Sequence, residues 1–385
     1  NIYTGQISFT LLTLFGMWKP LSWKLQWQTW LYHIFSVFMI TIYLTFIISL
    51  FMHFVKVSQP IETITENLFY FLCIVATFIK QISIMIKRKT IVESKGKLLN
   101  KFCKPEDLYE SEILLKCSQI CRSNTIIFLF LVNITAISII IGPLIKKNNI
   151  VLPLQAWYPF NLNSKWIFCM TYLHQILGLF MAANTSASVE GLTLTFMLQI
   201  CAQLEIIINR LHLLSNLPKL NNIIEAEWII SKRESRLISK CVKHHIHMYS
   251  LGQKLNEIFG LVIFVQFFTS MISLCATIYQ LSRLNSQNPT YWIMVTSVSS
   301  VIMQIFLYCF YGQRISEKST AVADAVYLTN WIALTNRTKK DLILMMIRAT
   351  KPIQLSGSSA IVMSIKTFVK IIKSAYSAYN LLAST

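Results

Sequence analysis

Long runs of apolar residues with few charges recur along the chain. A membrane-spanning helix needs roughly 20 mostly apolar residues. We predict seven such spans, at Leu31–Val55, Asn67–Ile86, Thr125–Leu144, Trp166–Leu198, Ile258–Leu281, Tyr291–Tyr311 and Ser356–Leu382. The fourth run is too long for one span perpendicular to the bilayer, and the last contains three lysines. The pattern predicts an all-α membrane protein with seven transmembrane helices.

The segments between the spans alternate between long and short. The long segments 87–124, 199–257 and 312–355 favour helices, and Ala321–Ile347 has neither Gly nor Pro and shows one apolar face. We expect these helices to pack together on one side of the membrane. Independent amphipathic helices on the bilayer surface are the alternative. The short segments, which cannot build a separate binding domain, are 56–66, 145–165 and 282–290.

Basic residues are unevenly divided between the two sets of segments. The first 30 residues and the three long segments hold 26 Lys and Arg, whereas the three short segments hold 5. Lys and Arg accumulate in cytoplasmic segments close to membrane spans. We therefore predict a cytoplasmic N-terminus and, after seven spans, an extracellular C-terminus. This orientation is the reverse of that of a G-protein-coupled receptor.

The composition fits a membrane protein better than a cytosolic enzyme. Charged residues make up 13% of the 385 residues, about half the fraction that is usual in soluble domains. The net charge of +19 falls mostly on the predicted cytoplasmic side, where anionic lipids attract basic segments. The charge therefore needs no nucleic-acid partner, and no zinc-finger or helix-turn-helix motif accompanies it.

The sequence gives no sign of catalysis, of a cofactor or of a metal centre. The nine cysteines are scattered without a CxxC pair, and H-E-x-x-H, G-x-S-x-G and Walker A motifs are absent. His244, His245 and His247 are close in sequence, but no further ligand residues accompany them. A structural or solvated helix is the better interpretation of these histidines. We predict a non-enzymatic protein.

Aromatic and methionine side chains gather in the predicted outer halves of the spans. Small-molecule pockets between helices are mostly apolar and have a few polar anchors. We predict that a small volatile or lipophilic ligand binds there. Ordinary lipid-facing and packing residues are the alternative. The candidate ligand-binding residues are Phe69, Tyr70, Tyr172, His174, Phe180, Met181, Tyr291 and Met294.

The last predicted span carries a polar stripe. Lys366, Lys370 and Lys373 lie at helical spacing, and Ser377 continues the same face. Charges inside a membrane are costly unless they face water or protein, so the stripe favours an aqueous pathway. Simple packing, with the lysines reaching back to the cytoplasmic interface, is the alternative.

A series of short motifs runs through the C-terminal part of the chain. They are Cys241–Tyr249, Glu257–Gly260, Gln266–Phe268, Tyr308–Gly312, Tyr327, Trp331, Arg348–Pro352 and Lys373–Leu382. In their order, spacing and position at the chain end, these motifs resemble the insect odorant receptor family. The resemblance covers about the last 145 residues, whereas the part before Cys241 matches in topology and size only.

The resemblance implies a ligand-gated, non-selective cation channel in the plasma membrane of a sensory neuron. Such channels are heterotetramers that contain a shared coreceptor subunit. The coreceptor carries a long insertion before its fifth span, and the segment 199–257 is too short to hold it. The resemblance therefore indicates a ligand-tuning subunit, with a small volatile ligand, coreceptor subunits and the lipid bilayer as its partners.

The resemblance also implies a division of the chain into four regions. They are a cytoplasmic segment 1–30, helices one to six with the ligand pocket at 31–311, a cytoplasmic anchor at 312–355 and a pore-lining helix at 356–385. Carried over to this sequence, the anchor residues are Tyr327 and Trp331. The pore residues are Ser374, Ser377, Leu381 and Thr385, with Leu381 at the gate. Lys370 and Lys373 depart from this picture, because their charge repels cations.

Two related classes of receptor remain as alternatives. A gustatory receptor shares the fold, but its last-span signature does not fit Ser377-Ala-Tyr-Asn-Leu. A G-protein-coupled receptor requires the opposite charge bias and usually an outer disulfide, and no cysteine lies in the predicted outer segments.

Overall fold

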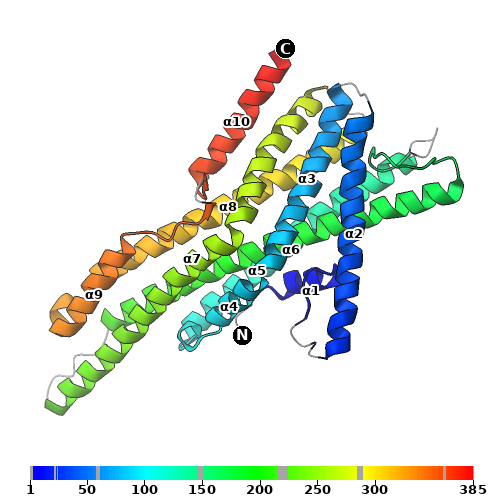
Figure 1. Ribbon diagram of the computed structural model, residues 1–385. Coiled ribbons are helices and arrows are strands. Elements are labelled where there is room, and N and C mark those ends of the chain that lie inside the picture. Colours follow the sequence, from blue (N-terminus) through cyan, green and yellow to red (C-terminus); the bar gives the residue numbers. More distant parts are fainter. Residues whose placement is uncertain are drawn as a thin grey trace.

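The protein is seen in a computed structural model that describes residues 3–20, 23, 25–57, 61–145, 151–215, 224–283, 289–358 and 361–384. Helices form most of it (Figure 1). They are α1 (Gln6–Leu14), α2 (Gln26–Lys56), α3 (Ile61–Ile86), α4 (Arg88–Leu98), η1 (Lys101–Cys103), α5 (Leu108–Ile145), α6 (Lys165–Ser215), α7 (Ile224–Arg283), α8 (Pro289–Tyr327), η2 (Trp331–Ala333), α9 (Asn336–Ala349) and α10 (Ile365–Ser384). Two short strands, β1 (Ser356–Gly357) and β2 (Ile361–Val362), precede α10.

Six of the described helices are long and apolar enough to cross a membrane, namely α2, α3, α5, α6, α7 and α8. Each contains one of the first six predicted spans. The helix α10 supplies the seventh, and its three lysines lower its hydropathy. The prediction of an all-α membrane protein with seven long helices is therefore confirmed.

Four helices continue far beyond the length that a bilayer requires. The helices α5, α6, α7 and α8 contain 38, 51, 60 and 39 residues. At 1.5 Å per residue, α7 is about 90 Å long. Its N-terminal end lies beside the C-terminal end of α8 and beside α9, far from the C-terminus of the chain (Figure 1). The sequence suggests separate membrane helices and polar helices. In α5, α6, α7 and α8, the polar helix continues directly from the membrane helix.

The prediction that Ala321–Ile347 is one helical stretch is wrong, because a break divides it. The helix α8 ends at Tyr327, and α9 begins only after Thr335, whose hydroxyl oxygen accepts a hydrogen bond from the N–H of Thr338 at 3.4 Å. Glu234 of α7 accepts from the N–H and the hydroxyl of Thr335, at 3.0 and 3.1 Å. A side chain about 100 residues away in sequence thus helps to fix the N-cap, and helical periodicity does not reveal such a contact.

The seventh helix begins later than the prediction of a helix from Ser356. Residues 356–362 contain the antiparallel pair β1 and β2. Gly357 lies so close to α7 that an added Cβ would stand 3.0 Å from the main chain of Phe264. The helix begins at Ile365, whose N–H donates to Oε1 of Gln313 at 3.0 Å. Contacts with other helices, absent from the local pattern, delay the helix start.

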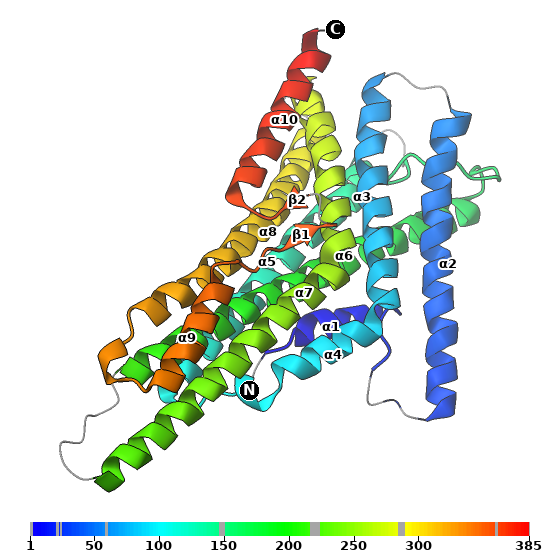
Figure 2. The same cartoon turned by 60° about the vertical axis from the view of Figure 1, so that its left-hand side comes forward.

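The connection between α9 and α10 lies across α7 and α8 as a strap, here defined as residues 350–358 and 361–364 (Figure 2). The N–H of Ile353 donates to the hydroxyl of Ser319 on α8 at 2.9 Å. At Gly312 of α8, an added Cβ would stand 2.4 Å from Cβ of Met363. Only glycine leaves room for the strap at that point, so the strap and α8 are packed main chain against main chain.

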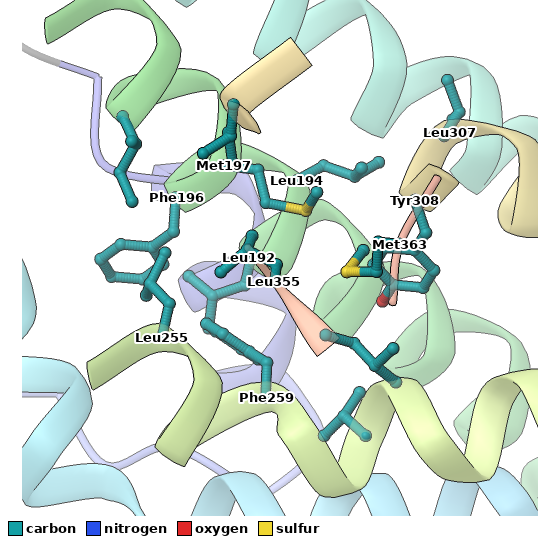
Figure 3. Close-up of a cluster of buried hydrophobic side chains, with 14 of the residues drawn as sticks. Leu192, Leu194, Phe196, Met197, Leu255, Phe259, Leu307, Tyr308, Leu355 and Met363 are labelled. Carbon is teal, nitrogen blue, oxygen red and sulfur yellow. The ribbon is translucent and has the colours of Figure 1, made fainter. Parts of the chain in front are cut away.

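The helix α6 lies at the centre of the apolar core. Figure 3 shows its side chains meeting α7, α8 and the strap. The labelled residues are Leu192, Leu194, Phe196, Met197, Leu255, Phe259, Leu307, Tyr308, Leu355 and Met363. Because α6 is covered on several sides, its sequence is apolar over a long stretch and carries no single hydrophobic stripe. This enclosure accounts for the unusual length of the fourth predicted span.

Candidate ligand-binding site

A cavity of about 140 Å³ lies inside the bundle between α3, α5, α6, α7 and α8. An engineered cavity of about 150 Å³ in another protein is large enough to hold benzene. The cavity is therefore of a size for a small organic molecule. Its lining residues include Phe69, Tyr70, Ile74, Lys80, Ala136, Ile139, Leu179, Ser186, Gln266, Ser270, Val301 and Gln304.

Apolar side chains form most of the wall. Phe69 and Tyr70 of α3 are buried and meet edge to face, with their ring centroids 5.2 Å apart. Ile139 of α5, Leu179 of α6 and Val301 of α8 close the wall from the other helices. Such a surface binds an apolar body through dispersion and through release of water.

A network of polar side chains forms the other part of the wall. Lys80 of α3 donates from Nζ to Oε1 of Glu190 at 2.8 Å and also to Oε1 of Gln266. The Nε2 group of Gln266 donates to the hydroxyl oxygen of Ser270 at 2.8 Å and to Oε1 of Gln304 at 2.6 Å. The side chains of Lys80 and Glu190 are only 2% and 3% exposed. An ion pair and two amides thus connect four helices inside the apolar core.

The sequence prediction of the site did not include this network. Lys80 interrupts an otherwise apolar span, and a charged residue within a span usually faces protein or water and serves a function. That signal was present in the sequence, but the prediction was built on aromatic and methionine side chains and on His174. Gln266 lies in a motif that supports the family resemblance, which assigns it no role.

Two of the eight predicted ligand-binding residues line the cavity, Phe69 and Tyr70. The hydroxyl of Tyr172 donates to the carbonyl of Ile140 at 2.6 Å, so its polar tip is used in packing α6 on α5. Phe180 lies partly buried against the core. The remaining predicted residues on α6 and α8 are His174, Met181, Tyr291 and Met294, and none of them lines the cavity.

Met181 and Met294 are almost completely buried, with 1% and 0% exposure, and belong to the apolar core. Tyr291 is partly buried, and its ring meets that of Trp292 at 5.6 Å. Met181 and Met294 thus pack in the core, as the packing alternative describes, whereas Tyr291 contacts its neighbour Trp292 on the same helix.

His174 lies at a second, larger hollow of about 840 Å³ between α2, the start of α6 and the segment before α6. Its Nε2 is 2.9 Å from the hydroxyl of Thr45, and its Nδ1 is 3.3 Å from the hydroxyl of Tyr158. Trp157 and Trp166 also line this hollow, which is open and almost entirely apolar. The predicted residues therefore do not form one site, because Phe69 and Tyr70 line the cavity and His174 lines this separate hollow.

The predicted pore residues lie on α10. Ser374 and Ser377 are exposed, as are Lys370 and Lys373, whereas Ala375 is buried. The polar stripe therefore points away from the rest of this chain. Of the other two predicted pore residues, Leu381 lies in α10 but its side chain is outside the described residues, and Thr385 lies outside them entirely.

The predicted anchor residues lie at the turn between α8 and α9. Tyr327 is 74% exposed, and Leu328 and Ile332 beside it are also exposed. Trp331 packs partly buried against the core, and its Nε1 donates to the carbonyl of Tyr327 at 3.1 Å. Trp331 thus stabilises the turn, and Tyr327 projects from it.

Comparison with protein families gives the class of the chain. The model of the 7tm odorant receptor family matches residues 60–376, which is most of the chain. The chain belongs to the 7tm odorant receptor family. This family member is therefore a multi-pass membrane protein, and neither the gustatory nor the G-protein-coupled alternative is favoured.

Similar curated proteins are insect odorant receptors. The chain is 26% identical over 233 residues to odorant receptor 9a of Drosophila melanogaster, and this match covers 60% of this chain and 56% of the relative. Odorant receptor 67a of the same insect is 25% identical over 218 residues, or 56% and 52% of the two chains. The matches thus span about half the length of these relatives. Odorant receptor 46a, isoform A, is 21% identical over 99% of this chain and 97% of its own.

Among solved structures, the insect olfactory receptor OR5 from Machilis hrabei has the same fold. Its complex with eugenol superposes with a TM-score of 0.84 and 14% sequence identity, covering 98% of this chain and 97% of that one. A second structure of the same receptor gives a TM-score of 0.82. The matched proteins are receptors, which confirms the prediction of a non-enzymatic protein.

Proposed function

We propose that this odorant receptor family member is the ligand-tuning subunit of a ligand-gated, non-selective cation channel that responds to a small volatile molecule. The observation that carries the proposal is the cavity lined by five helices in a chain of this family. The matched receptor OR5 was solved in complex with eugenol. A ligand opens such a channel to the extent that it binds the open state more tightly than the closed state.

The pore in this proposal is lined by the exposed face of α10. Ile371 and Ala375 are buried, and α10 rests on α7 and α8. The exposed serines Ser374 and Ser377 then face the axis of a tetramer, with Leu381 and Thr385 towards the outer end. A ring of leucine side chains blocks ions by excluding water from a constriction.

The partners in this proposal are coreceptor subunits, which assemble with this chain into a heterotetramer in the plasma membrane. The turn between α8 and α9 supports this assignment, because Tyr327, Leu328 and Ile332 expose large apolar surfaces there, at 74%, 68% and 91%. Aromatic residues are enriched among those that dominate protein interfaces. The turn is therefore the proposed contact between subunits.

The orientation of the proposed channel gives a direct test. With 26 basic residues on one side and 5 on the other, we expect a cytoplasmic N-terminus and an extracellular C-terminus. Epitope tags at the two ends, stained on intact and on permeabilised cells, measure this. Only the C-terminal tag should stain on intact cells, and staining of the N-terminal tag there would contradict the orientation.

Filling the cavity should lower the sensitivity of the receptor to its ligand. Ala136 is buried and lines the cavity from α5, so Ala136→Phe places a ring in the space that a ligand needs. We expect the half-maximal ligand concentration to rise by about tenfold or more, which corresponds to about 1.4 kcal/mol of binding free energy. The measurement is whole-cell current against a panel of volatile compounds, in cells that also express a coreceptor subunit.

The neighbouring substitution Ile137→Phe is the matched control. Ile137 lies on the same helix, is 42% exposed and does not line the cavity, so its dose–response curve should match that of the parent. Equal surface labelling of both variants excludes a loss of protein. An unchanged curve for Ala136→Phe would remove the cavity as the ligand site, and no current from the parent with any compound would count against the channel itself.

A further inference from the structure

The charged and amide groups of the cavity lie away from Phe69 and Tyr70. Lys80 lies ten residues after Tyr70 on α3, which is about 15 Å along the helix. Gln266 and Ser270 of α7 and Gln304 of α8 are hydrogen-bonded to Lys80 or to one another, so they lie at the same level. We call this level the polar end of the cavity.

Because lysine only donates hydrogen bonds, it fixes the orientation of the glutamine amides at the polar end. An ammonium group has three donors and no acceptor, so Gln266 must present its Oε1 to Lys80, and its Nε2 then points to Gln304. Gln304 in turn uses its Oε1 to accept that bond. Each amide oxygen thus already accepts one hydrogen bond within the network.

Two donor groups at this end, on Lys80 and Gln304, can reach a bound molecule. Lys80 makes two hydrogen bonds with its three N–H groups. Within the described residues, the Nε2 group of Gln304 donates to no protein acceptor, although Gln304 lines the cavity. Gln304 is partly buried. An acceptor atom on a bound molecule can accept hydrogen bonds from both residues.

The charges of Lys80 and Glu190 also restrict the charge of a ligand. Glu190 balances Lys80 at 2.8 Å and does not itself line the cavity. An anionic ligand would add a second negative charge for one lysine, and a cationic ligand would face the ammonium group. Either would leave an unbalanced charge in a low-dielectric site, which is strongly unfavourable. The site therefore favours an uncharged molecule.

We propose that the cavity selects an uncharged, mostly apolar molecule that carries a carbonyl oxygen, as in a ketone, an aldehyde or an ester. The carbonyl oxygen accepts hydrogen bonds from Gln304 and Lys80, and the apolar body extends towards Phe69 and Tyr70. This inference rests on the proposed function of the cavity as the ligand site. It assigns Gln304 as a residue that determines specificity.

The test compares matched compounds on one carbon skeleton, in cells that express the full chain with a coreceptor subunit. The aromatic set is acetophenone, ethylbenzene, phenethylamine and phenylacetate, and the linear set is methyl pentyl ketone, heptane, heptylamine and heptanoate. On the skeleton that gives the larger currents, the ketone should have a half-maximal concentration about tenfold or more below that of the hydrocarbon. The amine and the carboxylate should be weaker than the ketone.

The variant Gln304→Leu keeps the approximate volume and removes the donor. We expect it to lose about tenfold in potency for the ketone and to keep the parent's response to the hydrocarbon, a split that a general loss of folding does not produce. The control is Ser299→Ala on the same helix, because Ser299 is exposed and bonds only to the carbonyl of Val295 among described residues.

The outcomes separate the proposed selection of carbonyl compounds from the proposed channel function. Equal potency of ketone and hydrocarbon in the parent, or a more potent amine or carboxylate, would overturn the selection for a carbonyl. The same potency for the ketone in Gln304→Leu as in the parent would remove Gln304 from recognition. If Gln304→Leu does not reach the surface, the ranking of compounds in the parent still decides. No current from the parent with any compound would instead count against the proposed channel.

Discussion

Replacing Arg210 by Met is expected to lower the free energy of unfolding by about 3–5 kcal/mol, the range for removing one partner of a buried ion pair. The guanidinium of Arg210 binds both oxygens of Glu110, at 2.7 and 2.8 Å. It also donates to the carbonyls of Phe102 and Lys104 at 3.0 Å each. Without it, the carboxylate and both carbonyls lose a charged donor in a region where Glu110 is 1% exposed.

Thermal unfolding of the purified receptor in detergent measures this effect. The matched control is Lys240→Met, since Lys240 binds both oxygens of Glu106 at 2.9 and 3.0 Å but the pair is largely exposed. Exposed ion pairs contribute little, so this variant should unfold at nearly the parent temperature. If Arg210→Met and Lys240→Met lose equal stability, burial of the Arg210 ion pair does not account for the stability of the region between α4 and α5.

The second large effect is expected at Lys80. The variant Lys80→Met leaves the buried carboxylate of Glu190 without its ammonium partner, and a loss of about 3–5 kcal/mol is expected. The double variant Lys80→Met/Glu190→Met removes both charges and keeps similar volumes. Because two apolar residues often replace a buried ion pair at little cost, the double variant should recover most of the lost stability.

A double-mutant cycle measures this dependence. It compares the thermal unfolding of the parent, the two single variants and the double variant. We expect an interaction free energy between the two sites of about 3 kcal/mol or more, the upper end of the range for contacting residues. Additive losses would mean that Lys80 and Glu190 do not depend on one another. The double variant should also lose potency for carbonyl compounds, because Lys80 no longer donates into the cavity.

The positions of the membrane helices were predictable because apolar length alone determines them. The boundaries that the sequence missed depend on tertiary partners. The cap at Thr335 relies on Glu234 of another helix, and the start of α10 relies on Gln313 of α8. Neither contact leaves a trace in the local periodicity.

The site was predictable only in part for a similar reason. The search for aromatic and methionine side chains indicated Phe69 and Tyr70, which line the cavity, but it also selected Met181 and Met294, which are buried in the core and do not line it. Packing and ligand binding require the same apolar side chains, so composition does not separate them. The charged residue Lys80 was the more specific signal, because a membrane core tolerates such a group only with a partner.

The helix α8 connects the cavity with the seventh helix. Gln304 lines the cavity, and Gln313 accepts a hydrogen bond from the N–H of Ile365, in the first turn of α10, at 3.0 Å. The two glutamines are nine residues, or about 14 Å, apart on one unbroken helix. At Gly312, between this bond and the cavity, an added Cβ would stand 2.4 Å from Cβ of Met363 in the strap. The wall of the cavity and the start of α10 are therefore parts of one closely packed unit.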